Sequence, residues 1–510
     1  MNYPVWEIGI GGGVLIALVS ILHVFVSHFA IGGGLWLVLN EIRAHRTGDT
    51  RLREFVKTHS RFFMLLTLVF GAISGVGIWA TIGLVNPQAV SALVHAYVFG
   101  WAMEWVFFFV EIAAAIVYYY GWEKLTPGRH QLVGWIYFIS AWMSLFIING
   151  IITFMLTPGG WLETHGFWTG FFNPTFWPSL LIRTFGALTI AGIFALLTAA
   201  RLPRDDFRWA RTREGALWVL ISMGGVLAGA MWYRGAVGVW DDALLGAIPV
   251  LPLVGWIFTL GLVSTLAVAV WPLLAPKLWH PVGVALLILV GLGTMGSGEW
   301  MREAGRKPFT LYNYMYSTGL RVDQEPQITE DGVVAFTQWI SPAAAADETR
   351  LGRDLFLAWC QPCHTRNGYN GLEPWLAWWT DDYIGELVPR LGNMRALMPP
   401  WFGTEEEAAA VTAYLITLRP AEKPVLPADD LAAGEQAFAV SCGLCHTPFG
   451  YRALAESFTD MELDEIDEFL EESGDLDEGM PGYYGEGRER EVLSQYLQHI
   501  GRAAEEGGAS

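Results

Sequence analysis

Eight long apolar segments, separated by short polar connections, occupy the first three hundred residues of the chain. They are 8–40, 62–86, 92–120, 131–156, 178–200, 214–233, 246–273 and 280–301. A helix needs about 20 apolar residues to cross a bilayer, and most of these segments have that length. The pattern therefore predicts an all-α, polytopic membrane bundle of about eight transmembrane helices, followed by a polar C-terminal region.

Basic residues are concentrated in every second connection between these segments. Fourteen of them follow segments one, three, five and seven, whereas the intervening loops hold only Arg234. Because basic loops stay in the cytoplasm, we expect the N-terminus and everything after residue 301 to lie outside it. The sequence thus predicts a multi-pass protein of the bacterial cytoplasmic membrane with a periplasmic C-terminal region.

Composition supports this division. Among 510 residues, 53% are hydrophobic and 25 are Trp, which is too apolar for a soluble chain of this length, so membrane lipid is an expected partner. The net charge is −19, and the acidic residues gather after residue 400. An acidic region of this kind argues against a nucleic-acid partner.

The polar region contains an internal repeat in which every matching pair of positions has the same offset along the chain. Matching positions include Gly352 and Gly434, Phe356 and Phe438, and the Tyr-Leu pairs at 414–415 and 496–497. We therefore predict a membrane domain over 1–309, a linker over 310–347, and two tandem small all-α domains over 348–422 and 428–503.

Each copy carries a CxxCH motif, in which two thiols can form thioethers to haem while the adjacent His binds its iron. The alternative reading of a lone CxxC, a zinc or redox site, is disfavoured by the adjacent His and the repetition. In both copies a Met-Pro follows the His at the same spacing and supplies a second axial ligand, although Met394 competes with Met398 in the first. The predicted sites comprise Cys360, Cys363, His364 and Met398, and Cys442, Cys445, His446 and Met480. The region resembles class I cytochrome c domains and implies two covalently bound haem c groups.

The second copy also holds eleven acidic residues between Asp460 and Glu478. They form either a solvated acidic surface or a docking face for a basic periplasmic electron-donor cytochrome. The sequence leaves both interpretations open.

Ionisable residues inside membrane segments are costly, so each is a candidate functional residue. They are His23 and His28, then His95, Glu104 and Glu111, then Arg183, and finally Glu299, Arg302, Glu303 and Arg306. His23 is equally well a haem ligand or a hydrogen-bonded core histidine, whereas structural roles are favoured for His28 and His95. Glu104 and Glu111, seven apart on one helical face, could bind iron, relay protons or pair with Arg. So few histidines argue against a haem–copper oxidase or a cytochrome b.

Several segments, in order, resemble subunit I of the cytochrome bd quinol oxidases. They are LHVFVSHFAIGG, FGWAMEWVFFFVEIAAAIVYYYGWEKL, INGIITFMLTPGGW, FNPTFWPSLLIRTFGALTIAG and WMREAGRKPF, the last close to the family's E-x-G-R-Q-P-W. The resemblance implies that His23 is an axial haem ligand, that Glu303 binds a neighbouring high-spin haem, and that Arg306 is its basic companion. Glu104 and Glu111 match an acidic pair beside these haems, at a spacing one residue shorter than in the family.

The chain departs from that family at the low-spin haem and at the quinol site. Arg183 stands where the family has a histidine ligand, the segment IFTLG lacks the partner Met, and the quinol loop is reduced to about 235–245. We therefore expect one or two non-covalent membrane haems, of b or d type, and loss of the quinol-fed haem. The resemblance also implies a second membrane subunit.

Two functions are consistent with this pattern. The favoured one is a membrane haem oxidoreductase in which electrons from a periplasmic donor pass through two c haems to high-spin haems that reduce O2, or NO. Glu104, Glu111 and Arg306 would act at that site. The alternative is an electron conduit within a larger respiratory complex, exchanging electrons with quinol or another subunit without reducing a gas.

Overall fold

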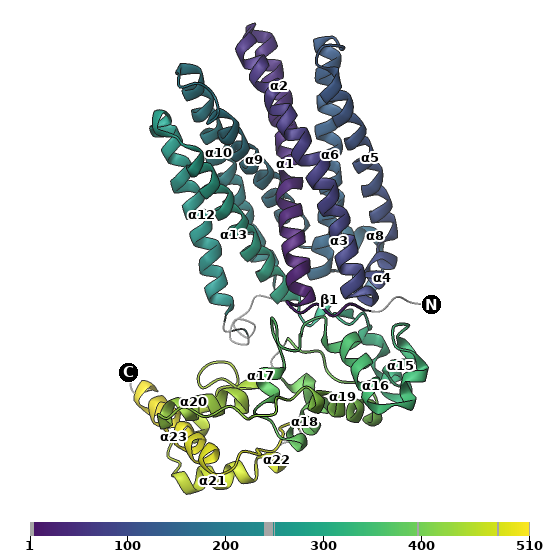
Figure 1. The fold of residues 1–510 in the computed structure, drawn as a ribbon, viewed down its shortest axis with the longest axis vertical. Coiled ribbons are helices and arrows are strands. Elements are labelled where there is room, and N and C mark those ends of the chain that lie inside the picture. Colours follow the sequence, from purple (N-terminus) through teal and green to yellow (C-terminus); the bar gives the residue numbers. More distant parts are fainter. Residues whose placement is uncertain (1–4, 239–247, 249, 395–396, 477–478, 509–510) are drawn as a thin grey trace.

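The computed structural model describes residues 5–238, 248, 250–394, 397–476 and 479–508. Long helices form an upright bundle, and shorter helices form a separate layer across one end of it (Figure 1). The predicted short quinol loop at about 235–245 lies largely outside the described residues.

Eight helical stretches are long and apolar enough to cross a membrane, as the sequence predicts. The second stretch is made of three consecutive elements, with a π-helical turn between two α-helices. The spans are α1 (Gly12–Thr47), α2 (Thr50–Met64) with η1 (Leu65–Gly71) and α3 (Ala72–Val85), α5 (Val98–Gly121), α6 (Pro127–Leu156), α9 (Phe176–Ala199), α10 (Asp206–Ala236), α12 (Leu251–Leu274) and α13 (Pro281–Arg306).

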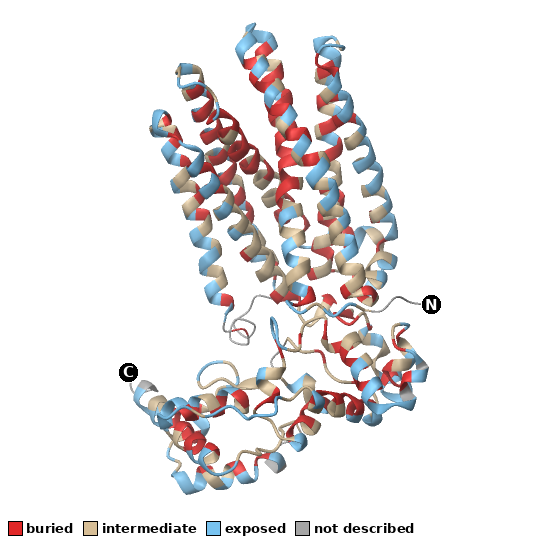
Figure 2. Cartoon of the chain, viewed as in Figure 1, coloured by how far each residue is buried: buried red, intermediate tan, exposed pale blue. Residues whose placement is uncertain are grey.

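Helix α1 lies at the centre of the bundle and packs against α2, α3, α6, α9 and α13. Most of its residues from Phe25 to Glu41 are buried, and Gly32 allows its backbone to approach that of α9. A Cβ at Gly32 would lie 2.0 Å from O of Ala187. The residues of α1 before Phe25, by contrast, are mostly half-buried or exposed (Figure 2).

Short elements close the end of the bundle that faces the C-terminal layer. They are α4 (Pro87–Ala96), α7 (Trp161–Thr164), α8 (Phe167–Phe171) and the antiparallel hairpin of β1 (Phe309–Leu311) and β2 (Met315–Tyr316). The connection between α12 and α13 at the opposite end contains η2 (Pro276–Leu278).

The C-terminal layer contains the two copies of the repeat. The first copy has α16 (Glu348–Leu355), η5 (Phe356–Cys360), α17 (Glu373–Leu376), α18 (Asp381–Leu387), η6 (Val388–Asn393) and α19 (Glu405–Thr417). The second has α20 (Asp430–Val440), η7 (Cys442–Leu444), η8 (Ala455–Phe458), α21 (Leu463–Glu471), α22 (Ser473–Leu476) and α23 (Arg488–Gly508).

The repeat is visible in matched helix contacts. A Cβ at Gly352 would lie 1.9 Å from O of Ala410, and one at Gly434 would lie 2.3 Å from O of Val492. Each glycine therefore lets the first helix of its copy lie directly against the last. Because the residues of the two crossings are related by the same offset as the sequence repeat, the two copies share one fold.

The segment expected to be a linker, 310–347, has ordered structure of its own. It contains most of the β-hairpin together with η3 (Val322–Gln324), α14 (Glu325–Asp331), α15 (Val333–Phe336) and η4 (Pro342–Ala346). Its side chains, such as Leu320 and Ile328, share one buried core with Phe356 of the first repeat copy. Apolar side chains spaced irregularly in sequence are brought together here by turns, which a search for helical period does not detect.

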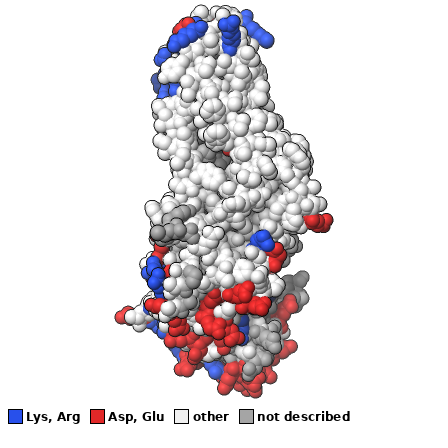
Figure 3. Space-filling model, turned by 90° about the vertical axis from the view of Figure 1, so that its right-hand side faces the viewer, with Lys and Arg blue, Asp and Glu red and all other residues white. Residues whose placement is uncertain are grey.

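Charge is distributed unevenly along the long axis of the molecule. Basic side chains gather at the far end of the bundle, a wide uncharged band follows, and acidic side chains dominate the C-terminal layer (Figure 3). The N-terminus and the C-terminal layer lie at the same end of the bundle (Figure 1). The orientation predicted from the sequence rests on this difference in charge between the two ends of the bundle.

Candidate functional site

His23 lies in the half-buried part of α1 and contacts α3. Its Nδ1 lies 3.1 Å from Oγ of Ser74, and that hydroxyl donates its own hydrogen to O of Phe70 at 2.7 Å. With the hydroxyl hydrogen directed at Phe70, Oγ can accept a hydrogen bond from Nδ1–H of His23, and in that tautomer the lone pair is on Nε2. A histidine fixed in this tautomer by its second nitrogen is the arrangement that metal-binding histidines use.

The imidazole of His23 packs closely against α3. A Cβ at Gly75 would lie 3.1 Å from Cε1 of His23, so a glycine keeps α3 close to the imidazole. Several neighbouring residues of α1 are half-buried although α1 is the central helix. His23 therefore remains a candidate haem ligand.

The C-terminal end of α13 carries a chain of ion pairs that continues to α9. Arg183 Nη2 lies 3.0 Å from Oε1 of Glu299, whose Oε2 lies 2.7 Å from Nε of Arg302. Arg302 Nη2 lies 2.9 Å from Oε1 of Glu303, and Oε2 of Glu303 pairs with Arg306. Glu299 and Arg302, which the sequence left without a role, are therefore the links between Arg183 and Glu303.

Both carboxylate oxygens of Glu303 are engaged by arginines, so iron ligation by Glu303 would require one of these pairs to open. Arg306 is buried and donates from Nη1 to O of Thr310 at 2.7 Å. Nε of Arg306 and Nη1 of Arg302 are buried without a hydrogen-bond partner among the described residues. These two unsatisfied guanidinium donors suit an anionic group. Iron ligation by Glu303 remains a prediction.

The two membrane acids of α5 face α6. Ser144 Oγ donates to Oε1 of Glu104 at 2.7 Å, and Oη of Tyr137 lies 3.1 Å from Oε1 of Glu111. Oη of Tyr137 also lies 3.1 Å from O of Ala30 on α1. No arginine pairs with either acid in the described structure, which leaves iron binding and proton relay of the three roles that the sequence allowed. The sequence analysis did not identify Ser144 and Tyr137. Single polar residues are common in apolar helices, so neither residue stood out as a partner of these acids.

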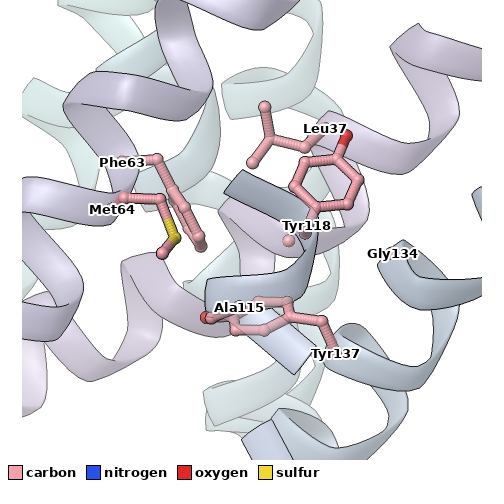
Figure 4. Close-up of a pocket in the computed structure, with 8 residues that line it drawn as sticks. Leu37, Phe63, Met64, Ala115, Tyr118, Gly134 and Tyr137 are labelled. Atoms are coloured by element: carbon pink, nitrogen blue, oxygen red, sulfur yellow. The ribbon is translucent and has the colours of Figure 1, made fainter. Parts of the chain in front are cut away.

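A small cavity lies beside this acidic pair. Its volume is about 10 Å³, which is room for about one water molecule, and its walls are almost entirely apolar (Figure 4). It is lined by Gly34, Leu37, Phe63, Met64, Ala115, Tyr118, Gly134 and Tyr137. The cavity is too small for a prosthetic group, and it adds no binding site to the bundle.

The other two histidines that the sequence analysis placed in membrane segments make local contacts. Nδ1 of His28 lies 2.7 Å from O of Val24, and the side chain is buried. Nδ1 of His95 lies 2.7 Å from O of Ser91 near the end of the bundle that faces the C-terminal layer. These contacts agree with the structural roles that the sequence favoured for both residues.

In the first repeat copy the structure brings the predicted axial residues together. Nε2 of His364 lies 3.5 Å from Sδ of Met398, and Nδ1 of His364 lies 3.1 Å from O of Asn370. The imidazole thus presents Nε2 toward the thioether, and these two side chains would hold the iron of a bound haem. The geometry favours Met398 over Met394, and burial raises the pKa of the Cys360 thiol to about 12.

The second copy repeats the same local geometry. Nδ1 of His446 lies 3.0 Å from O of Arg452, the residue that matches Asn370 in the repeat. Burial raises the pKa of the Cys442 thiol to about 12, as in the first copy. Met480 lies in an irregular segment between α22 and α23. A CxxCH motif followed by a Met-Pro fits haem c in both copies, and the ligand assignments remain predictions.

The CxxCH segment of the first copy rests on the end of the bundle that faces the C-terminal layer. Gln361 donates from Nε2 to O of Trp6, and Nε of Arg366 lies 2.7 Å from Oε1 of Glu7. The N of Trp6 in turn donates to O of Leu84 at the end of α3, at 2.9 Å. The N-terminal segment is therefore held between the membrane bundle and the CxxCH segment.

The fold is that of a polytopic all-α membrane protein with ionisable side chains at one end of its bundle and a C-terminal region that carries two CxxCH motifs. Residues 14–238 match the family model described as cytochrome bd terminal oxidase subunit I. Residues 347–415 match the family model described as cytochrome C oxidase, cbb3-type, subunit III. The chain thus joins a membrane domain similar to cytochrome bd subunit I to a C-terminal cytochrome c domain.

Individual relatives agree with this assignment. A curated protein of Bacillus subtilis (strain 168), provisionally named cytochrome bd menaquinol oxidase subunit I, is 22% identical over 220 residues, which cover 40% of this chain and 48% of that protein. The chain therefore spans about half the length of this curated relative. The solved structure of the bd oxidase from Geobacillus thermodenitrificans has a TM-score of 0.53 at 14% identity, covering 60% of this chain and 89% of that one. This second likeness concerns the fold alone.

Proposed function

We propose that the protein is a membrane-bound haem oxidoreductase that accepts electrons from a donor outside the cytoplasm and reduces O2, or NO, in its membrane domain. The observation that carries the proposal is the position of the CxxCH segment of the first c domain. Gln361, Arg366 and the intervening N-terminal segment hold it against the outer end of the bundle, near α13. Lys307, directly after α13, also has its Nζ 3.7 Å from Sγ of Cys363.

Haem bound in the outer half of the bundle would supply one-electron chemistry and a place for a small gas to react. Nε2 of His23 would hold the iron, because Oγ of Ser74 can accept a hydrogen bond from Nδ1–H on the other side of the ring. Glu303 is the second candidate ligand, with Arg302 and Arg306 balancing its charge. Reduction of a gas consumes protons, and the carboxylates of Glu104 and Glu111 would hold and move them.

The same proposal accounts for what the chain lacks relative to quinol oxidases. Arg183 stands at the position of a haem-ligand histidine and is engaged by Glu299 at 3.0 Å. A guanidinium in an ion pair cannot ligate iron, which supports loss of the low-spin haem fed by quinol. Two c-type sites at the outer face supply an alternative entry for electrons. We also propose that the protein has membrane lipid and a second membrane subunit as partners.

The test is consumption of O2 and NO by the purified full-length protein supplied with a reduced c-type donor. Carbon monoxide binding to the ferrous membrane haem separates the two functions. We expect a CO-reactive high-spin haem that His23→Ala abolishes, with haem c content unchanged. A membrane domain that is wholly low-spin and silent to CO, without gas consumption, would instead establish the electron-conduit function.

Glu303 is tested separately from His23. Glu303→Gln keeps the shape of the side chain and removes its charge, whereas Glu303→Ala removes both. If Glu303 binds iron, both variants change the membrane-haem spectrum. An unchanged spectrum in both would return Glu303 to the role of a link between Arg302 and Arg306.

A further inference from the structure

The two cytochrome c domains meet through hydrogen bonds that converge on the haem-binding elements of the second domain. Trp379 Nε1 donates to O of Val440 at 2.7 Å, and Tyr383 Oη donates to O of Ser441 at 3.0 Å. Val440 and Ser441 immediately precede Cys442, the first residue of the CxxCH motif. Side chains around α18 of the first domain thus contact the start of the second haem-binding motif.

A second group of contacts reaches the segment that contains Met480. Oε2 of Glu386, on α18, accepts a hydrogen bond from N of Gly482 at 2.9 Å. Oε1 of the same carboxylate accepts from Oη of Tyr484 at 2.5 Å. Residues 479–486 have no regular secondary structure that would satisfy their backbone groups. Glu386 therefore satisfies one of them from the other domain, two residues after the predicted iron ligand.

Asn393 completes the contact on the other side of Met480. Its Nδ2 donates to O of Gly479 at 3.3 Å, and its own backbone O accepts from Nη1 of Arg452 at 2.6 Å. Arg452 is the residue whose carbonyl oxygen receives Nδ1–H of His446. The first domain thus touches the supports of both predicted axial ligands of the second haem.

The Met398 segment of the first domain is held differently. Trp401 packs against Trp359 with ring centroids 5.1 Å apart, and Phe402 packs against Tyr316 at 5.4 Å. These aromatic contacts lie within the core that the first domain shares with the hairpin. The sequence MPPWFG in the first copy becomes MPGYYG in the second, so Tyr484 takes the place of Phe402. Its hydroxyl group is what reaches Glu386.

We propose that Glu386 of the first domain is a positioning residue for Met480, so that the methionine ligation and reduction potential of the second haem depend on the contact between the domains. Burial would raise the pKa of Glu386, but hydrogen bonds from Tyr484 and Gly482 and the nearby Arg390 outweigh it and lower that pKa. The carboxylate is therefore charged at neutral pH, and charge-assisted hydrogen bonds are the stronger kind. A thioether ligand raises the potential of haem iron, so a loosened Met480 segment lowers it.

The experiment uses the full-length protein carrying Glu386→Ala, with Asp381→Ala as the control. Asp381 lies on the same helix, and its carboxylate pairs with Arg419 of the same domain at 2.6 Å. Two quantities are measured: the red-edge absorbance band that methionine ligation gives ferric haem c, and the potentials of both c haems in a redox titration. Met480→Ala identifies which component of the titration belongs to the second haem.

We expect Glu386→Ala to reduce the band toward half of its intensity and to lower the potential of the component that Met480→Ala also changes. Asp381→Ala should leave both unchanged. If the Glu386→Ala protein does not accumulate, the test uses Glu386→Gln and Asn393→Ala. In these variants we expect smaller decreases in the methionine band and in the potential of the second haem. A full band and an unaltered second potential in these variants would overturn the proposal. Neither readout depends on gas reduction in the membrane domain.

Discussion

Gly368 allows the first c domain to lie directly on the N-terminal segment of the membrane domain. A Cβ at this position would lie 1.9 Å from the backbone O of Gly9, whereas ordinary contact begins at 3.4 Å. The substitution Gly368→Ala must therefore push the two backbones apart until that contact becomes an ordinary one. The nearest contact within the c domain, Oγ1 of Thr365 at 3.2 Å, is far less severe. The change thus acts on the contact between the domains more than on the haem site itself.

The structural cost can be set against the contacts that hold this interface. Overpacking of this kind costs about 1–3 kcal/mol. The ion pair between Arg366 and Glu7 is more than a third exposed on both sides, so it contributes at most about 1 kcal/mol. The hydrogen bond from Gln361 to Trp6 adds about 1 kcal/mol. This overpacking cost is similar in size to the stabilisation from these two contacts. We therefore expect residues 6–11 to detach from the c domain, while the core that this domain shares with segment 310–347 remains.

The assay measures electron transfer from the pre-reduced c haems to the membrane haem by stopped-flow spectroscopy. Hydrogen exchange at residues 6–11 measures docking independently. Gly385→Ala is the matched control, since its Cβ would meet only Cγ2 of Thr412, at 3.9 Å in the same domain. We expect Gly368→Ala to slow the transfer at least tenfold and to lose protection of 6–11, with normal haem c content. Wild-type protection together with a wild-type rate would refute the reasoning.

Two further predictions concern the c domains. Gly352→Ala and Gly434→Ala each place a Cβ within 2.3 Å of a backbone oxygen of the facing helix. Each variant should therefore abolish haem c incorporation into its own domain and spare the other domain, as counted by pyridine haemochrome. Loss of both haems in either variant would contradict independent folding of the copies. The pKa of Glu386 in the folded protein lies below its usual 4.5. The charged carboxylate stabilises the contact between the two c domains together with Arg390, Tyr484 and the nearby Tyr383. This stabilisation is complete above pH 4.5 and is lost as the pH falls through the lowered pKa. The methionine band of the second haem should therefore weaken in acid at a higher pH than that of the first, and simultaneous loss would count against it.

Much of the architecture was predictable because it follows from local spacing. Apolar segments of sufficient length identified the eight spans, and a repeat with one constant offset identified two copies of one small fold. What escaped prediction depends on residues that only packing brings together. Ser74 lies 51 residues from His23, and Gly482 lies 96 residues from Glu386. The core formed by the segment 310–347 escaped for the same reason, since its apolar residues follow no single period.

The chain of ion pairs between α9 and α13 gives a prediction in which the two partners of one salt bridge are not equivalent. The Arg183 side chain is only 11% exposed, and beyond Glu299 its described contact is with Oγ of Ser179 at 3.3 Å. Loss of Glu299 therefore strands a buried guanidinium, which costs about 3–5 kcal/mol. Loss of Arg183 costs less, because Glu299 keeps Arg302 at 2.7 Å. Thermal unfolding in detergent should rank Glu299→Leu as more destabilising than Arg183→Met, with the double variant close to Arg183→Met. The reverse order would mean that Arg183 supports something other than this pair.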